Sequence, residues 1–233
     1  MPKHTSAHGA RLTRATAPGE PRTTLKEQAY RQIEEAIVTL KLPPGAVVSE
    51  QAMSEMTGIG RTPIREAIQR LAQERLIVVL PQRGLLIAEM DVRKQLRLLE
   101  TRREVERLIA RSAARRATET ERQRFAGLAT EFEAEAESND DEAFMRSDRE
   151  FNELCLAAAR NEFAEGAMRL MHGLSRRFWY VHYKQAADLP QTARRHAAIA
   201  HAIAHGDADA AGEALDRLLD DIEAFTRSTV LSG

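Results

Sequence analysis

The sequence predicts a mostly α-helical protein in two parts, a small N-terminal domain that ends in a β-hairpin and an all-α bundle of about six helices. Three observations support this prediction. Apolar residues recur at helical spacing along most of the chain, strand-forming residues gather around residues 76–88, and no strand pattern recurs after about residue 91. With 233 residues, the chain is long enough for two domains, expected at 23–90 and 91–233.

The chain is expected to begin with a disordered tail over residues 1–22. This stretch contains several prolines and glycines and scarcely any large apolar residue, so it cannot bury enough surface to become ordered. The next stretch predicts a helix from Thr24 to Lys41, which ends before Pro43. Its inward residues are expected to be Leu25, Ala29, Ile33, Ile37 and Leu40.

Two short helical patterns follow, separated by a break at Thr57-Gly58. Their apolar residues are Ala52, Met53 and Met56 before the break, and Ile64, Ala67, Ile68 and Leu71 after it. The second helix can begin at Gly60 or Thr62, with Pro63 in its first turn, where a missing N–H costs nothing. Arg61 and Arg65 are four residues apart and therefore project from one side of its amino end, away from the apolar stripe. This pattern predicts a helix-turn-helix whose polar side meets an anion.

A hairpin is predicted directly downstream. Residues 76–80 and 85–88 are rich in strand formers and surround a Pro81-Gln82-Arg83-Gly84 turn. Arg83 places a cation at the tip, beside a glycine that allows close approach of the backbone to a phosphate. A helix-turn-helix followed by a hairpin is a winged helix; the alternative is an ordinary amphipathic helix pair with solvated arginines.

The turn and the start of the second helix resemble the signature of the GntR family of bacterial repressors. The matching residues are Gly58-Ile59-Gly60-Arg61-Thr62-Pro63-Ile64-Arg65-Glu66-Ala67, which depart from the pattern only at Gly60. The resemblance covers about residues 24–90. It implies that Arg61 and Arg65 read base edges in the major groove, that Thr62 holds a phosphate, and that Gly84 marks a wing in the minor groove. Gly60 lacks the usual hydroxyl, and Gln51 stands where the FadR-like type member carries an arginine that touches DNA.

From about Asp91 onward the sequence predicts six helices, at residues 92–117, 119–137, 140–159, 162–186, 191–205 and 207–228. Six helices after a winged head resemble the FCD effector-binding domain of the FadR-like subgroup. The motifs that carry this resemblance are Arg102-x-x-x-Glu106 and His196-x-x-Ile199-x-x-x-Ile203 with Gly206-Asp207.

Charge and composition limit the partners of the protein. Residues 1–90 carry 12 Lys and Arg against 9 Asp and Glu, and the remainder carries 22 against 26, which fits a DNA-facing head on a neutral-to-acidic body. No stretch approaches the ~20 apolar residues of a membrane span, and the start of the chain has no apolar signal core. We therefore expect a cytoplasmic protein with no membrane partner. The single cysteine, Cys155, excludes an intramolecular disulfide and a Cys-based zinc cluster and is expected to be a buried small hydrophobe.

Four polar residues lie on inward stripes of the predicted bundle, where they are expected to line one polar cavity: Arg102, Asp148, Asn152 and His196. A carboxylate aimed inward, such as that of Asp148, must be paired, hydrated or bound to a ligand. The guanidinium fork of Arg102 could pair bidentately with the carboxylate of a small organic acid.

The FCD resemblance also raises the question of a metal. Many FCD domains hold a divalent metal with an aspartate, a histidine four residues later, a histidine matching His196 and a third on the last helix. Here Asn152 and Leu218 stand at two of the histidine positions, so only Asp148 and His196 are strong ligands. No metal is expected at this degenerate site. The metal-free polar pocket is the preferred prediction, and a divalent metal site and a satisfied structural network are the alternatives.

Aromatic residues crowd the predicted helix at 162–186. Phe178 lies on its apolar stripe and is expected in the core. Trp179 and Tyr183 form an i,i+4 pair that could cap a ligand, and plain core or dimer packing is the alternative.

Together these features predict a ligand-responsive transcription regulator, a repressor, that binds a pseudo-palindromic operator in double-stranded DNA as a homodimer and is released or modulated by a small carboxylate. No cofactor is expected. One alternative is a constitutive DNA-binding protein whose bundle only dimerises. The other is a metal-dependent enzyme that uses Asp148 and His196; against it, the sequence shows no nucleophile-plus-base spacing, phosphate loop or complete metal triad.

Overall fold

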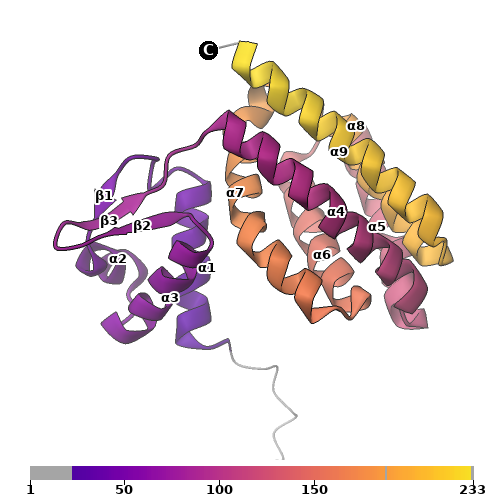
Figure 1. Cartoon of the computed structure of the whole chain (residues 1–233). Helices are drawn as coiled ribbons and strands as arrows, with labels where there is room; N and C mark the ends of the chain where they lie inside the picture. Colours follow the sequence, from indigo (N-terminus) through magenta and orange to yellow (C-terminus); the bar gives the residue numbers. More distant parts are fainter. Residues whose placement is uncertain (1–22, 187, 232–233) are drawn as a thin grey trace, which may run out of the picture.

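The computed structural model describes residues 23–186 and 188–231, without the side chains of residues 183–186 and 230–231. The chain forms an N-terminal domain of helices and a small sheet, followed by a helical bundle (Figure 1). The predicted fold class is thereby confirmed. The predicted tail over residues 1–22 lies outside the described residues. The elements of the N-terminal domain are α1 (Leu25–Val38), β1 (Val47–Val48), α2 (Glu50–Thr57), α3 (Arg61–Gln73), β2 (Ile77–Leu80) and β3 (Gly84–Ile87).

Helix α1 is shorter than predicted. It is capped by Thr24, whose hydroxyl accepts a hydrogen bond from the backbone N–H of Glu27 at 3.3 Å. It ends at Val38 and not at Lys41, because Leu40 adopts a positive φ of 62° that a helix cannot contain. Leu25 is 60% exposed and not inward, although it shares a face with Ala29, because it is the first residue of the helix and extends beyond the packed part of that face. Three of the predicted core residues are fully buried, namely Ala29, Ile33 and Ile37.

Helices α2 and α3 form the predicted helix-turn-helix. Helix α2 ends at Gly58, which is left-handed, and α3 follows with Gly60 as its N-cap, one of the two predicted starts. The apolar stripe of α3 is buried throughout, at Ile64, Ala67, Ile68 and Leu71. In α2, only Met53 is buried. Ala52 is exposed because it is turned about 100° from Met53, and Met56 is 45% exposed because it faces an open cleft between α1 and α6.

The wing is a three-stranded antiparallel sheet in the order β1-β3-β2. The two-residue strand β1 was not predicted; it pairs with β3 through Val47↔Leu86 and Val48↔Leu85. Gly84, at the start of β3, has a φ of 105°, and a Cβ there would lie 2.8 Å from the carbonyl oxygen of Val48. Pairing with β1 therefore already requires a glycine at this position, apart from any contact with phosphate.

The bundle consists of α4 (Val92–Arg116), α5 (Glu119–Ser138), α6 (Asp141–Ala159), α7 (Glu162–Ala186), α8 (Leu189–His205) and α9 (Ala208–Leu231). Helix α4 leads from the hairpin into the bundle and runs beside α9, α5 packs on α8, and α7 faces the N-terminal domain (Figure 1). Buried phenylalanines form much of the core: Phe125, Phe132, Phe144 and Phe151. Within residues 23–186 and 188–231, no helix combines the length and apolar composition that a bilayer span requires.

Candidate functional site

The amino end of α3 presents a cationic surface. Arg61, Thr62 and Arg65 are exposed there, on the side opposite the buried stripe. No side-chain hydrogen bond caps this end, because the N-cap residue is Gly60. The first backbone N–H groups of the helix and its positive dipole end therefore add to the two guanidinium groups and favour binding of an anion.

Both arginines are held by the first turn of α2. Arg61 donates from Nη2 to Oε1 of Gln51 at 2.8 Å, and Arg65 donates from Nε to Oε2 of Glu50 at 2.7 Å. Gln51 in turn donates to Glu55 at 2.8 Å. Glu50 was not predicted to belong to this surface. The helix dipole by itself favours an acidic residue in the first turn of a helix. The sequence therefore showed no sign that Glu50 also pairs with Arg65.

The hairpin supplies a second exposed cation. Arg83 lies in the turn between β2 and β3 and is exposed. Figure 1 shows the tip of this hairpin directed away from the bundle. Arg83 is therefore accessible to a large partner that contacts the N-terminal domain.

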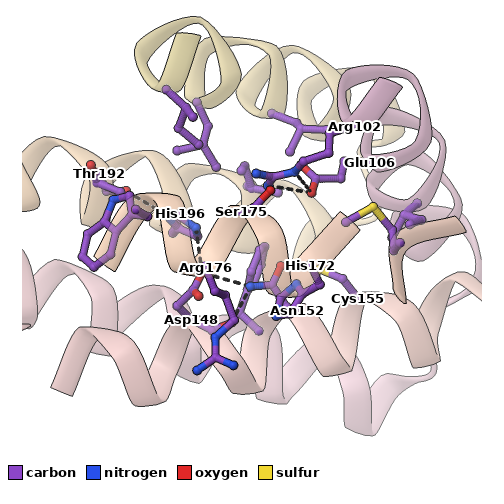
Figure 2. A pocket seen from close by; sticks show the side chains of 18 of the residues that line it. Arg102, Glu106, Asp148, Asn152, Cys155, His172, Ser175, Arg176, Thr192 and His196 are labelled. Atoms are coloured by element: carbon purple, nitrogen blue, oxygen red, sulfur yellow. Dashed lines mark hydrogen bonds and ion pairs between the residues drawn. The ribbon is translucent and has the colours of Figure 1, made fainter. Parts of the chain in front are cut away.

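A cavity of about 120 Å³ lies inside the bundle between α4, α6, α7, α8 and α9 (Figure 2). Its wall contains five residues that the sequence placed in a pocket: Arg102, Asp148, Asn152, Trp179 and His196. The side chain of Tyr183 lies outside the described part of the chain. Phe178 is buried, as expected, and also lines the cavity. Such a volume holds several water molecules or a small organic ligand.

At one end of the cavity, Arg102 is already paired. Its Nε and Nη2 lie 2.8 and 2.7 Å from Oε1 of Glu106, one turn further along α4. The hydroxyl of Ser175 is buried and has no hydrogen-bond partner in the described structure, and Figure 2 shows it beside this pair. The end thus offers a compensated ion pair and an unused hydroxyl. The i,i+4 spacing of Arg102 and Glu106 could have revealed the pair.

At the other end, His196 bridges two oxygen acceptors. Its Nδ1 lies 2.9 Å from the carbonyl oxygen of Thr192, and its Nε2 lies 3.2 Å from Oδ1 of Asp148. Both ring nitrogens of His196 therefore face an oxygen atom inside the bundle. Asn152 also donates to Oδ1 of Asp148, at 2.9 Å. Burial acts to raise the pKa of Asp148, but the hydrogen bond and charge of His196 outweigh it and keep the pKa below its ordinary value.

A second histidine, His172, lines the cavity from α7 and was missed in the sequence. Burial lowers its pKa to about 4; Asp148 opposes this shift, whereas the charge of Arg176 adds to it. His172 is therefore neutral near pH 7. Its position could have been found from spacing, because residues 168, 172, 175 and 179 form one helical stripe and all line the cavity.

The donor set does not fit a metal. In the described part of the chain, no three His, Cys, Asp or Glu side chains are grouped so as to hold a metal ion. Oδ1 of Asp148 is engaged by His196 and Asn152, and the apolar side chain of Leu218 forms another part of the wall. Cys155 is also in the wall, but burial raises the pKa of its thiol well above the ordinary value, which leaves it protonated and poorly suited to bind metal.

A winged helix-turn-helix joined to an all-α bundle with an internal polar cavity defines a two-domain, DNA-binding transcription regulator. Comparison with known families agrees. Residues 25–87 match the family of bacterial regulatory proteins named gntR, and residues 97–221 match the FCD domain. The chain belongs to the GntR family and carries an FCD domain, which confirms the resemblance seen in the sequence.

Relatives extend over both domains. The HTH-type transcriptional repressor RspR of Escherichia coli K12 is 25% identical over 207 residues, which are 89% of this chain and 91% of RspR. The galactonate operon transcriptional repressor of the same organism is 30% identical over 199 residues, covering 76% of this chain and 86% of that repressor. The fold is similar to that of E. coli McbR/YncC, with a TM-score of 0.73 at 18% identity over 89% of this chain and 99% of that one.

Proposed function

We propose that the protein is a repressor that binds a pseudo-palindromic operator as a homodimer and is released or modulated by a small organic acid in the cytoplasm. The observation that carries the proposal is the cavity inside the bundle, which has polar groups at both ends and an apolar wall between them. This composition is typical of small-molecule sites. Two relatives that span both domains are named as repressors.

The operator would be read by the exposed cationic surface of the N-terminal domain. Arg61 and Arg65 would contact base edges, and Thr62 with the uncapped helix end at Gly60 would contact phosphate. Gln51 would orient Arg61 through the 2.8 Å hydrogen bond between them. Arg83 and Gly84 would place the wing on the neighbouring groove. One winged helix contacts few base pairs, so a twofold dimer on two half-sites is the economical arrangement.

The effector would be recognised at the polar ends of the cavity. A carboxylate would approach Arg102 in competition with Glu106, and the unpaired hydroxyl of Ser175 would donate to it. Galactonate, which appears in the name of one relative, has a carboxylate and hydroxyl groups. The hydroxyl groups could donate hydrogen bonds to Glu106 in return. The neutral imidazole of His172 and the pair of Asp148 with His196 would meet the other end of such a molecule.

A thermal-shift screen of small carboxylates, including galactonate and other hydroxy acids, tests this function. A true effector should raise the melting temperature of the protein in a concentration-dependent manner and change its affinity for an operator selected from random-sequence DNA. The internally compensated charges of the cavity favour a second candidate, a constitutive regulator whose bundle serves only dimerisation. A stabilising ligand with no effect on DNA affinity, or no ligand at all, would support that second candidate.

A further inference from the structure

Helix α7 contacts both the cavity and the N-terminal domain. Over residues 172–179, one face of the helix lines the cavity with His172, Ser175 and Trp179. On the adjoining face, Gly173, Arg176 and Arg177 contact the N-terminal domain, and Arg176 also lines the cavity. The cavity wall and the domain junction therefore share one rigid element, α7.

Helix α7 approaches the N-terminal domain closely at Gly173. A Cβ at this position would lie 2.6 Å from Cδ1 of Leu76, so a side chain larger than hydrogen would displace Leu76. Leu76 lies three residues after the end of α3, the proposed recognition helix, and its backbone N–H donates to the carbonyl oxygen of Leu71 in α3 at 2.9 Å. Contact with α7 thus reaches the carboxyl end of the recognition helix.

Arg176 forms a buried ion pair across the junction. Its Nη1 lies 2.7 and 2.9 Å from the two carboxylate oxygens of Glu34 in α1, and its Nη2 donates to Glu35 at 3.1 Å. The side chains of Arg176 and Glu34 are 12% and 10% exposed, so the pair is weakly screened by solvent. Breaking one partner of such a pair leaves an uncompensated buried charge.

Arg177 holds the connection between the domains. Its side chain is 1% exposed and donates to the backbone carbonyls of Ala88 at 2.7 Å and Glu89 at 3.4 Å, between β3 and α4. Its Nε is buried and has no hydrogen-bond partner among the residues that the structure describes. A buried guanidinium with incomplete hydrogen bonding is costly for stability, so its presence at the domain junction calls for an explanation.

We propose that Arg176 and Arg177 position the DNA-binding domain on the bundle, so that a change in the cavity wall formed by α7 is transmitted to the recognition helix. The inference rests on the proposed ligand response, because it supplies the route between ligand and DNA. By reciprocity, operator binding must then also alter the cavity wall. This second direction can be measured without knowing the effector.

The chain contains one tryptophan, Trp179, which lies in the cavity wall three residues after Arg176 and packs near Phe144 at a ring separation of 5.9 Å. Its fluorescence therefore reports on the surroundings of α7 at the cavity wall. The experiment titrates the full chain with labelled operator selected from random-sequence DNA and follows DNA anisotropy and tryptophan emission together. We expect the emission of Trp179 to change in parallel with DNA binding in the wild-type protein.

Two variants test the route from opposite sides. Arg176→Gln removes the charge on α7, and Glu34→Gln removes its partner in the N-terminal domain. Each should still bind the operator, with an affinity changed by about tenfold, and each should lose the response of Trp179 to DNA. The matched control is Arg169→Gln, which removes an exposed ion pair with Glu165 on the same helix and should retain both the affinity and the response.

Rescue separates positioning from simple loss of stability. The double variant Glu34→Arg with Arg176→Glu restores an ion pair in reversed polarity and should recover the Trp179 response. Operator binding with an unchanged Trp179 signal in the wild-type protein would overturn the inference, as would a wild-type response in Arg176→Gln and Glu34→Gln. A coupled Trp179 response in a protein that no small carboxylate stabilises would leave the junction intact and contradict the ligand response proposed above.

Discussion

The recognition surface and the cavity use charge in opposite ways. Arg61 and Arg65 are exposed; Arg61 donates to the neutral amide of Gln51, and Arg65 forms an ion pair with Glu50. In the cavity, Arg102 and Asp148 are largely enclosed by protein and paired inside it. Exposed ion pairs are worth about 0–1 kcal/mol and exchange readily for a phosphate, whereas breaking a buried pair costs about 3–5 kcal/mol. The exposed arginines of α3 can therefore exchange their partners for the phosphates of any duplex. A ligand can bind in the cavity only if it replaces the hydrogen bonds and ion pairs that it disrupts.

The largest effect is expected at the recognition helix. Arg61→Ala and Arg65→Ala should each abolish sequence preference, because each lost base contact costs roughly 1–3 kcal/mol. Competition between the operator and a scrambled duplex measures this loss. Both variants should remain folded, since neither side chain is in the core. Unchanged discrimination in either variant would show that its arginine does not read bases.

The second largest effect is expected at Arg102. Arg102→Ala should lower the free energy of unfolding by about 3 kcal/mol, because Glu106 is left buried without its partner. It should also abolish the thermal shift produced by an effector carboxylate while DNA binding without ligand survives. Adding Glu106→Gln to Arg102→Ala should recover much of the stability but none of the ligand shift. A full ligand shift in Arg102→Ala would place the carboxylate elsewhere in the cavity.

A pH effect is expected from His172. Its folded pKa of about 4 lies below the ordinary value of 6.5, so the unfolded chain binds a proton first as the pH falls. The contribution of His172 to stability is therefore complete above pH 6.5 and is lost progressively between pH 6.5 and about 4, by at most about 3 kcal/mol. Denaturant unfolding at several pH values should show a shallower decline in His172→Gln than in the wild-type protein. Parallel curves for the two proteins would exclude this role.

A smaller and less selective effect is expected at the wing. Arg83→Ala should weaken all duplexes to a similar extent and lower the slope of log affinity against log salt by about 1, as expected for one lost phosphate contact. Titrations of operator and scrambled duplex at several salt concentrations measure both quantities. A loss confined to the operator would instead assign Arg83 to base recognition.

The smallest effect is expected from metal removal. A chelator should leave the melting temperature and operator affinity unchanged, because Asp148 is engaged by His196 and Asn152 and no third strong ligand joins them among the described residues. Elemental analysis of purified protein supplies the independent measurement. Stoichiometric metal that is lost in Asp148→Ala would contradict this expectation.

Local patterns predicted the elements but not the long-range partners. The stripe from Ile64 to Leu71 and the spacing of Arg61 and Arg65 follow directly from helical periodicity. The strand β1 could not be predicted, because two residues carry no pattern and are ordered only by pairing with β3. Met56 is exposed because it faces a cleft between the domains, and sequence periodicity cannot reveal such a cleft.

The cavity shows the same limit. Inward spacing was enough to place Arg102, Asp148 and His196 in its wall. The i,i+4 spacing of Arg102 and Glu106 allows an ion pair, but it did not show that two donors of Arg102 would be engaged by Glu106 inside the cavity. Similarly, the contacts of Arg176 with Glu34 join residues 142 positions apart in the chain, and only the tertiary structure brings them together.

The order of the sheet has a consequence for operator geometry. Strand β3 lies in the centre of the sheet and bonds to β1, and β1 leads directly into α2, whose Gln51 bonds to Arg61. The wing and α2 therefore form one rigid unit. The separation between the proposed major-groove and minor-groove contacts would therefore be set within each N-terminal domain. An extra base pair inside one half-site should weaken binding sharply, because the domain cannot stretch to follow it.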